Sequence, residues 1–205
     1  MSKIDLKKEL RHLYVPSTKE VVLVDVPQMN FLMVDGRGDP NTAQEFQDAM
    51  EVLYGLAYGI KFGLKKKGLG PDYSVMPSEG LWWMASGGEF DLEIKDEWLW
   101  TLMIMQPDHI TKEMFDQAKA ELKAKKNPLA LNKVRFEPFH EGLSVQIMHI
   151  GPYAEEKPTI EKMHIFIKEQ DYRPRGRHHE IYLGDPRRTP PERLKTVLRQ
   201  PVEKA

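Results

Sequence analysis

The sequence predicts an α+β fold in which a strand–helix–strand–strand module occurs twice. Two observations support this prediction. NFLMVDGRGDP aligns with QIMHIGPYAEE, which pairs Met33 with Met148 and Gly36 with Gly151, each at the end of a strand just before a helix. The order of elements then repeats as well, so that LWWMA in the first half corresponds to HHEIYL in the second. Side by side, the modules would form two antiparallel sheets with helices on one side and a cleft between pseudo-twofold halves.

In the first half, EVVLVDV and NFLMVDG predict two successive strands, because both are rich in β-branched and apolar residues. A helix is predicted from NTAQEF, where Thr42 and Glu45 have the spacing of a capping box and Phe46 begins an apolar stripe of helical period. LWWMA, FDLEIK and EWLWTLMIMQ follow as three strand candidates separated by turn residues.

Between the halves, Thr111 is a candidate cap for a helix that joins them and ends before Pro128. KVRFEPF and GLSVQIMHIGPY then predict a strand pair. A third helix begins near Pro158, and HHEIYL predicts the strand after it. The residues TPPE from Thr189 predict a final capped helix.

The composition favours a soluble globular protein. Of the 205 residues, 40% are hydrophobic and 30% are charged, and 30 Lys and Arg residues balance 31 Asp and Glu residues. This balance argues against binding to nucleic acid or to an anionic membrane surface. The chain has no cysteine, and it has no signal peptide and no apolar run of the roughly 20 residues that a membrane helix needs. We therefore expect a cytoplasmic protein, and no protein partner is evident.

All four tryptophans fall within residues 82–100, and several methionines lie near them. In EWLWTLMIMQ both alternating faces are apolar, so both require burial. One face would serve the helices, and the other would face a second layer or an apolar cavity. Core packing explains such residues in most proteins, but flat rings beside flexible thioethers also suit planar ligands.

Glu180 is the main candidate for a functional residue. Because side chains alternate along a strand, Glu180 and Tyr182 share one face with His178, whereas His179 shares the other with Ile181. If helices cover the opposite face, Glu180 and Tyr182 look into the cleft, where a carboxylate must be paired, solvated or shifted in pKa. The alternative is a structural ion pair with one of three arginines nearby in sequence, Arg173, Arg175 or Arg177.

The stretches EGLSVQIMHIGPYAEEKPTI and HHEIYLGDPRRTPPERLKTVLRQPV, with PSEGLWW and EWLWTLMI before them, resemble the GyrI-like small-molecule-binding proteins. The resemblance spans about residues 20–202. It implies residues 1–19 as a lead-in and residues 20–205 as one small-molecule-binding domain, with repeats at about 20–110 and 130–205. It also implies a site between the repeats in which aromatic side chains and a buried acid hold apolar, often cationic molecules. The acid of EIYL is Glu180 and the tyrosine of GPY is Tyr153.

Some stand-alone members of this family hydrolyse cyclopropane-bearing, DNA-alkylating natural products, so the resemblance implies two functions. The first is binding of planar hydrophobic molecules, and the second is hydrolysis with Glu180 as base and Tyr153, Glu156 or Glu155 as proton donor. The residues expected to bind ligand are Trp82, Trp83, Trp98, Tyr54, His149, Tyr153, Glu180 and Tyr182.

Several of these residues also have ordinary structural explanations. Packing explains Tyr54, and a hydrogen-bonded core histidine explains His149. No cofactor is expected. No metal site is expected either, because alternation puts His178 and His179 on opposite faces of their strand.

Overall fold

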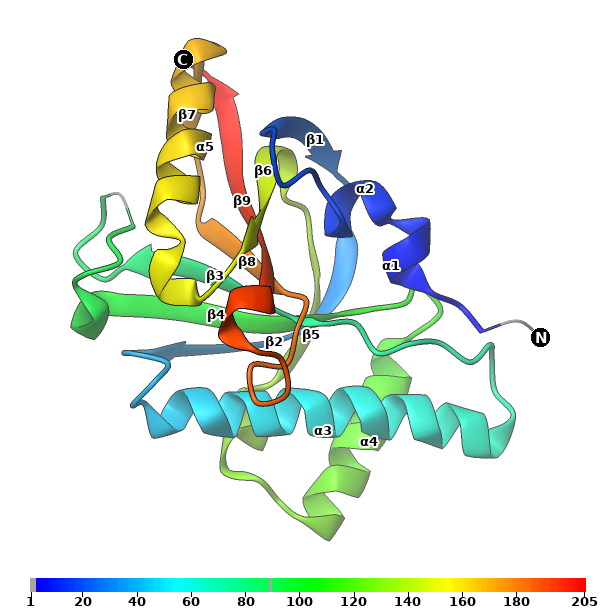
Figure 1. The fold of residues 1–205 in the computed structure, drawn as a ribbon. Helices are drawn as coiled ribbons and strands as arrows, with labels where there is room; N and C mark the ends of the chain where they lie inside the picture. Colours follow the sequence, from blue (N-terminus) through cyan, green and yellow to red (C-terminus); the bar gives the residue numbers. More distant parts are fainter. Residues whose placement is uncertain (1–2, 89) are drawn as a thin grey trace.

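The computed structural model describes residues 3–88 and 90–205. The described chain contains a nine-stranded antiparallel sheet, in which eight strands run in the order β1-β6-β9-β8-β3-β4-β2-β5 and β7 pairs with β9 (Figure 1). The strands are β1 (Val22–Val26), β2 (Met29–Arg37), β3 (Ser78–Met84), β4 (Trp98–Gln106), β5 (Arg135–Phe139), β6 (Gly142–Ile150), β7 (Tyr172–Pro174), β8 (His178–Tyr182) and β9 (Lys195–Lys204).

The described residues also form five α-helices, two of them before the first strand, and four short 3-10 helices. The α-helices are α1 (Leu6–Glu9), α2 (Arg11–Tyr14), α3 (Gln44–Lys67), α4 (Lys112–Lys125) and α5 (Lys157–Glu169). The 3-10 helices are η1 (Lys95–Glu97), η2 (Leu129–Lys133), η3 (Tyr153–Glu155) and η4 (Pro191–Arg193). No helix in the described ranges is long and apolar enough to cross a membrane.

The predicted repeat is confirmed. The first module is β2-α3-β3-β4 and the second is β6-α5-β8-β9, and the sheet order places β3 beside β8 where the modules meet. The strands of both modules form one continuous sheet. LWWMA and HHEIYL, which the repeat made equivalent, are therefore neighbouring strands at its centre.

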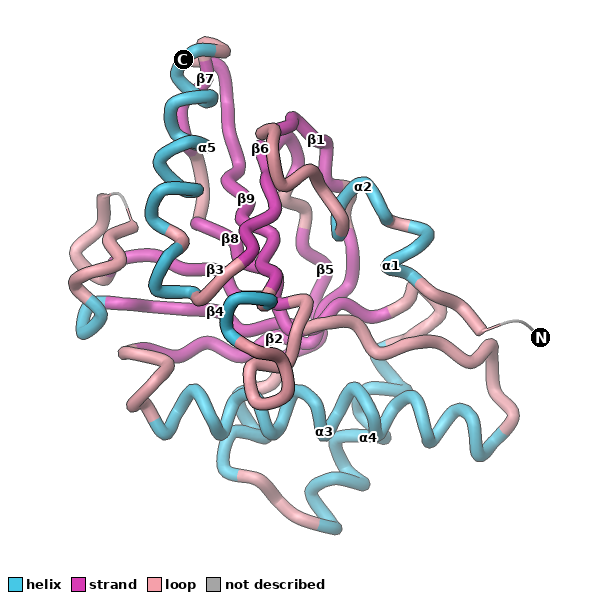
Figure 2. The backbone as a smooth tube through the Cα atoms, in the orientation of Figure 1, coloured by secondary structure: helices cyan, strands magenta, loops and turns pink. Residues whose placement is uncertain are grey.

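The helices cover both faces of this sheet. We call the face that carries Glu180 the front and the face that carries His179 the back. On the front, α3 places Phe46 against Trp82, and α5 places Thr159 against His149. The short helices α1 and α2 lie on the back, where Tyr14 contacts Glu79, and α4 packs against α3 (Figure 2).

Helix α3 is correctly predicted, but its start differs from the expectation. Its N-cap residue is Ala43 and makes no side-chain cap, so the predicted capping box of Thr42 and Glu45 does not form. It ends at Gly68, whose φ of 64° suits a residue without a Cβ atom. The Thr111 cap of α4 is confirmed, because its side chain accepts a hydrogen bond from the Met114 N–H.

Three local predictions are wrong. The final helix expected from Thr189 is only the three-residue η4, and the next residues form β9, because pairing with β6, β7 and β8 outweighs the capping signal. Residues 90–94 are irregular and not a strand, since Phe90 packs among the aromatic rings. β5 and β6 do not pair with each other; β5 pairs with β2, and β6 pairs with β1 and β9.

Candidate functional site

The site is built on the front of β8, where His178, Glu180 and Tyr182 project together as the alternation predicts. Only 7% of Glu180 is exposed. The Tyr182 hydroxyl donates a hydrogen bond to Glu180 Oε2 at 2.8 Å, and the Trp82 indole N–H donates to Tyr182 Oη at 2.9 Å. His178 Nε2 lies 3.3 Å from Glu180 Oε1, in a geometry that makes no hydrogen bond with it.

Gly80 makes this chain of hydrogen bonds possible. It lies opposite Glu180 on β3, and a Cβ atom there would come within 2.6 Å of Trp82 Nε1 and 3.1 Å of Tyr182 Oη. The Trp82 side chain therefore folds back over a position that has room only for hydrogen. In the motif EGLWW the glycine therefore makes room for the side chain of the tryptophan two residues later, which its composition alone did not reveal.

A second carboxyl group lies next to Glu180. Glu156 precedes α5 and is only 1% exposed, whereas Glu155 is exposed, so Glu156 is the glutamate that faces inward. Burial raises the pKa of Glu156 well above its usual value, and the charge of Glu180 raises it further, while the neighbouring Thr196 lowers it. Among the described residues, Glu156 Oε1 has no hydrogen-bond partner. The arrangement is a neutral carboxylic acid beside a second carboxyl group.

Two tyrosines complete the polar part of the site. The Tyr153 ring packs edge-on against the Tyr182 ring, with centroids 5.6 Å apart. Burial raises the pKa of Tyr153 to about 12, and the neighbouring carboxyl groups add to the rise. Burial and Glu180 also raise the pKa of Tyr182 well above its usual value. Both hydroxyls therefore keep their protons at neutral pH, and that of Tyr182 donates to Glu180.

Aromatic rings form the adjoining wall. We call Phe46, Trp82, Phe90 and Trp98 the aromatic cluster. The ring centroid of Trp98 lies 5.4 Å from that of Trp82 and 5.1 Å from that of Phe90. Phe90 also stacks on His178 at 5.4 Å with an interplanar angle of 11°. The rings contact one another, and the site is bounded by flat apolar surfaces on one side and by carboxyl and hydroxyl groups on the other.

The structure therefore brings together Glu180, Tyr182, Tyr153, Glu156, Trp82 and Trp98. Tyr54 of α3 lies nearby and accepts a hydrogen bond from the Ser78 N–H. His149 is 7% exposed and contacts Thr159 Oγ1 at 3.0 Å and the Pro152 carbonyl at 3.3 Å, so it braces the turn that carries Tyr153. Burial lowers its pKa.

Three expectations differ from the structure. Trp83 lies on the back, where the Arg177 guanidinium stacks 3.5 Å above its ring, so it does not join the site. The three nearby arginines pair with other groups: Arg173 with Glu203, Arg175 with backbone carbonyls, and Arg177 with Thr101. Glu180 also shares its face with α3 and α5, whereas the expectation placed the helices on the opposite face.

Sequence reasoning did not include Phe90, Phe46 or His178 among the site residues. His178 could have been included from the sequence, because it shares one face of the strand with Glu180 and Tyr182. Phe90 had none, because it comes from an irregular segment whose position depends on tertiary packing. Among residues 3–88 and 90–205, no group of three His, Cys, Asp or Glu side chains is arranged to hold a metal ion.

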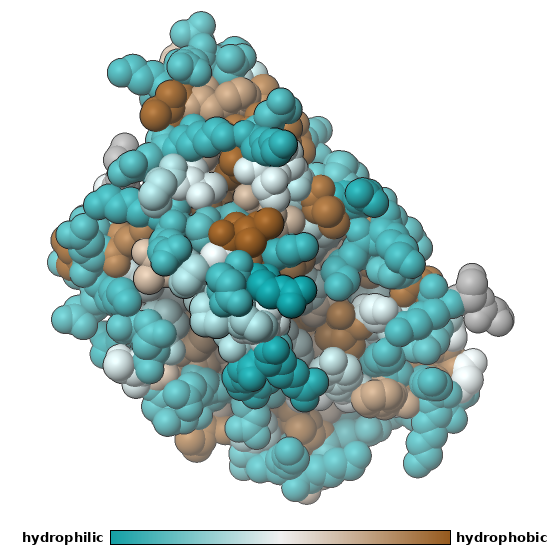
Figure 3. Space-filling model, in the orientation of Figure 1, coloured by the Kyte–Doolittle hydropathy of each residue, from teal (hydrophilic) through white to brown (hydrophobic). Residues whose placement is uncertain are grey.

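A cavity of about 550 Å³ opens beside η4. Its lining is Ile150, Arg188, Thr189, Pro190, Glu192, Arg193 and Lys195. Figure 3 shows hydrophilic side chains gathered over this loop around a small hydrophobic patch. None of the predicted site residues lines this cavity.

Comparison with known proteins identifies the class of this protein. Residues 19–203 match the family described as GyrI-like small molecule binding domain, and the chain belongs to that family. No match was found among curated proteins.

Solved structures agree with this assignment. An uncharacterized conserved protein from Listeria innocua is 43% identical, with a TM-score of 0.91 over 98% of this chain and 100% of that one. A hydrolase from Listeria innocua is 41% identical, with a TM-score of 0.85 over the same shares. The C-terminal domain of EcmrR shares the fold at 11% identity, with a TM-score of 0.55 over 91% of this chain and 98% of that one.

Proposed function

We propose that this protein is a hydrolase that binds planar hydrophobic molecules carrying a strained, electrophilic ring. The observation that carries this proposal is the pair formed by Glu156 and Glu180. Burial raises the pKa of Glu156, and a protonated carboxyl group beside a second carboxyl group is a common arrangement for general acid and general base catalysis. The hydrolase from Listeria innocua, 41% identical to this chain, supports the same reaction class.

The chemistry fits a cyclopropane conjugated to a ketone, as in the alkylating natural products hydrolysed by stand-alone GyrI-like proteins. Water forms a C–O bond to the ring carbon, the ring C–C bond breaks, and its electron pair moves through the conjugated system to the carbonyl oxygen. Glu180 accepts the proton that water loses. Glu156, which is neutral and buried, donates a proton to the developing oxyanion, and the Tyr153 hydroxyl is a further donor beside it. The Tyr182 hydroxyl instead donates to Glu180 and orients the base. The net change is the addition of one water molecule.

The aromatic cluster accounts for the choice of ligand. Flat rings provide a large apolar contact surface for a planar molecule, and they attract a cationic one through their π faces. Because Phe90 lies on an irregular segment between β3 and η1, entry of a planar ligand requires little disruption of the sheet. The lack of cysteine in the sequence is consistent with action in the cytoplasm.

The test is to incubate the protein with a cyclopropane-bearing alkylator and to measure the water adduct by mass spectrometry. Glu180→Gln and Glu156→Gln should each lower the rate by about 100-fold or more, since each removes a proton-transfer group. The matched control is Glu155→Gln, which changes the exposed neighbour and should retain the wild-type rate. Unchanged turnover in Glu180→Gln would refute the role of the base.

A binding protein without turnover is the second candidate, and the aromatic cluster favours it. Titration of the tryptophan fluorescence with planar cationic dyes should then give saturable quenching, while no water adduct forms from the alkylator. Flat titrations with several dyes would exclude a planar-ligand site altogether.

A further inference from the structure

The two repeats meet at the pairing of β3 with β8, which we call the seam. It consists of four residue pairs, from Glu79 opposite Ile181 to Trp82 opposite His178. By comparison, β3 forms seven such pairs with β4, and β6 forms seven with β9. Glu180 therefore lies on a short seam, and its position depends on the interactions between β3 and β8.

The two faces of the seam carry different groups. On the front are Gly80 and Glu180, with the hydrogen bond between Trp82 and Tyr182 crossing from one strand to the other. On the back, the residues next to them in sequence, Glu79 and His179, form an ion pair of 3.0 Å across the same junction. Glu79 and His179 on the back are thus the direct sequence neighbours of Gly80 and Glu180 on the front.

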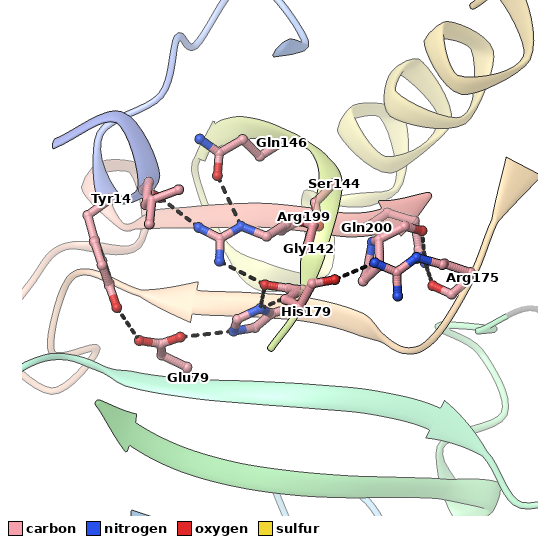
Figure 4. A network of polar contacts seen from close by, with 12 residues as sticks. Tyr14, Glu79, Gly142, Ser144, Gln146, Arg175, His179, Arg199 and Gln200 are labelled. Carbon is pink, nitrogen blue, oxygen red and sulfur yellow. Dashed lines mark hydrogen bonds and ion pairs between the residues drawn. The ribbon is translucent and has the colours of Figure 1, made fainter. Parts of the chain in front are cut away.

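This ion pair belongs to a larger group of buried polar and charged side chains, shown in Figure 4. We call this group the back network: Tyr14, Glu79, Glu141, His179 and Arg199. His179 Nδ1 lies 2.9 Å from Glu141 Oε1, and Arg199 Nη1 lies 3.0 Å from Glu141 Oε2. None of the five is more than 2% exposed. A buried cluster of this kind is strongly destabilised when one partner is removed, because the remaining charges lose their compensation.

His179 carries a positive charge in this network. Both of its ring nitrogens face carboxylate oxygens, so both must bear hydrogen. Burial lowers its pKa, but Glu141 and Glu79 outweigh burial and raise the pKa to about 9. The groups that face it are Glu79 from β3 and Glu141 from the turn before β6; Tyr14 from α2 and Arg199 from β9 bind these two carboxylates.

The network is closed by the N-terminal segment. Tyr14 Oη donates to Glu79 Oε1 at 2.8 Å, and Arg199 Nη2 donates to the Leu13 carbonyl at 2.8 Å. The side chain of Gln146 accepts from Arg199 Nε at 3.0 Å and donates to the His12 carbonyl at 2.6 Å. Three hydrogen bonds therefore join residues 12–14 to the back of the sheet: one to Glu79 at the seam, one to Arg199 of β9 and one to Gln146 of β6.

We propose that the back network positions Glu180, with His179 as the positioning residue, and that the docked N-terminal segment is therefore a working part of the site. A charged His179 holds β3 and β8 together behind Glu180. Loss of that charge leaves two buried carboxylates with Arg199 as the remaining cation of the network, which favours separation of the strands at the seam. The catalytic role of Glu180 rests on the proposed function, but its placement can be measured without any substrate.

The test uses the indole N–H of Trp82, which reports on the front of the seam. In ¹⁵N-labelled protein its cross-peak, assigned with Trp82→Phe, should shift in Tyr14→Phe, because that variant removes only the hydroxyl that binds Glu79. The matched control is Tyr73→Phe, since Tyr73 is 2% exposed and contacts the same segment, yet its hydroxyl has no hydrogen-bond partner within the described residues. This control should leave the cross-peak in place.

The role of His179 is tested by titration in a Glu156→Gln background, which removes a buried carboxyl group with a raised pKa from the front of the site. The Trp82 cross-peak should move with a midpoint near pH 9, and the additional substitution His179→Gln should abolish that transition. Turnover or dye affinity should fall by about threefold or more in Tyr14→Phe and stay within twofold in Tyr73→Phe.

A lower melting temperature in Tyr14→Phe, with the cross-peak and the affinity unchanged, would show a purely structural network and overturn the proposal. A transition near pH 9 that persists without His179 would overturn it as well. If no substrate is turned over, the proposed function fails, whereas the cross-peak still decides whether the network positions the site.

Discussion

Replacement of Gly80 by alanine should disrupt the hydrogen bonds that hold Glu180. The added Cβ atom would lie 2.6 Å from Trp82 Nε1, and the indole cannot move away freely because it packs against Phe46, Phe90 and Trp98. Overpacking of this kind costs about 1–3 kcal/mol, and loss of the bond from Trp82 to Tyr182 adds about 1 kcal/mol. We therefore expect the free energy of unfolding to fall by about 2–4 kcal/mol in Gly80→Ala.

The assay is equilibrium unfolding in urea at pH 7, with ligand affinity measured in parallel. Gly59→Ala is the matched control, because Gly59 lies within α3 and a Cβ atom there would meet nothing within 4 Å. This control should stabilise the protein by about 0.5–1 kcal/mol, since alanine is the better helix former. A Gly80→Ala protein as stable as wild type, with unchanged affinity, would refute the account of Gly80 given above.

Three further outcomes are expected. The pKa of His179 is raised to about 9 in the folded protein, so its contribution to stability is complete below about pH 6.5 and is lost as the pH rises through 9. His179 and Arg199 outweigh burial and lower the pKa of Glu141 to about 2, so its contribution is complete above about pH 4.5 and is lost as the pH falls towards 2; urea midpoints measured from pH 3 to 10 should show both declines. Tyr182→Phe should lower stability by about 1–3 kcal/mol in thermal unfolding, because a buried indole N–H loses its acceptor and a carboxylate loses its donor. Trp83→Phe should leave dye affinity unchanged in fluorescence titrations, and a tenfold loss would contradict its position on the back of the sheet.

Much of the architecture could be read from the sequence. The matched glycine turns after Met33 and Met148 identified the repeat, because both halves need the same strand-to-helix transition. Alternation along HHEIYL separated Glu180 from His179, because the two-residue period of a strand is a local property. Where local signals competed with distant pairing, prediction failed: the residues after Thr189 carry a capping signal, yet they form β9 because three other strands pair with it.

The sequence by itself therefore determined the repeat, the family and the face of the strand on which Glu180 lies, since these depend on local periodicity and on motifs. Only the tertiary structure decided the surroundings of that residue. In the structure Glu156, and not Glu155, faces inward, Trp83 lies on the other face of the sheet, and His178, with Phe90 stacked on its ring, lies beside Glu180. Each of these positions depends on which chain segments meet in space. The tertiary structure also joined the N-terminal segment to the back of β3 and β9 through hydrogen bonds between residues far apart in the sequence, and no local pattern encodes contacts of that range.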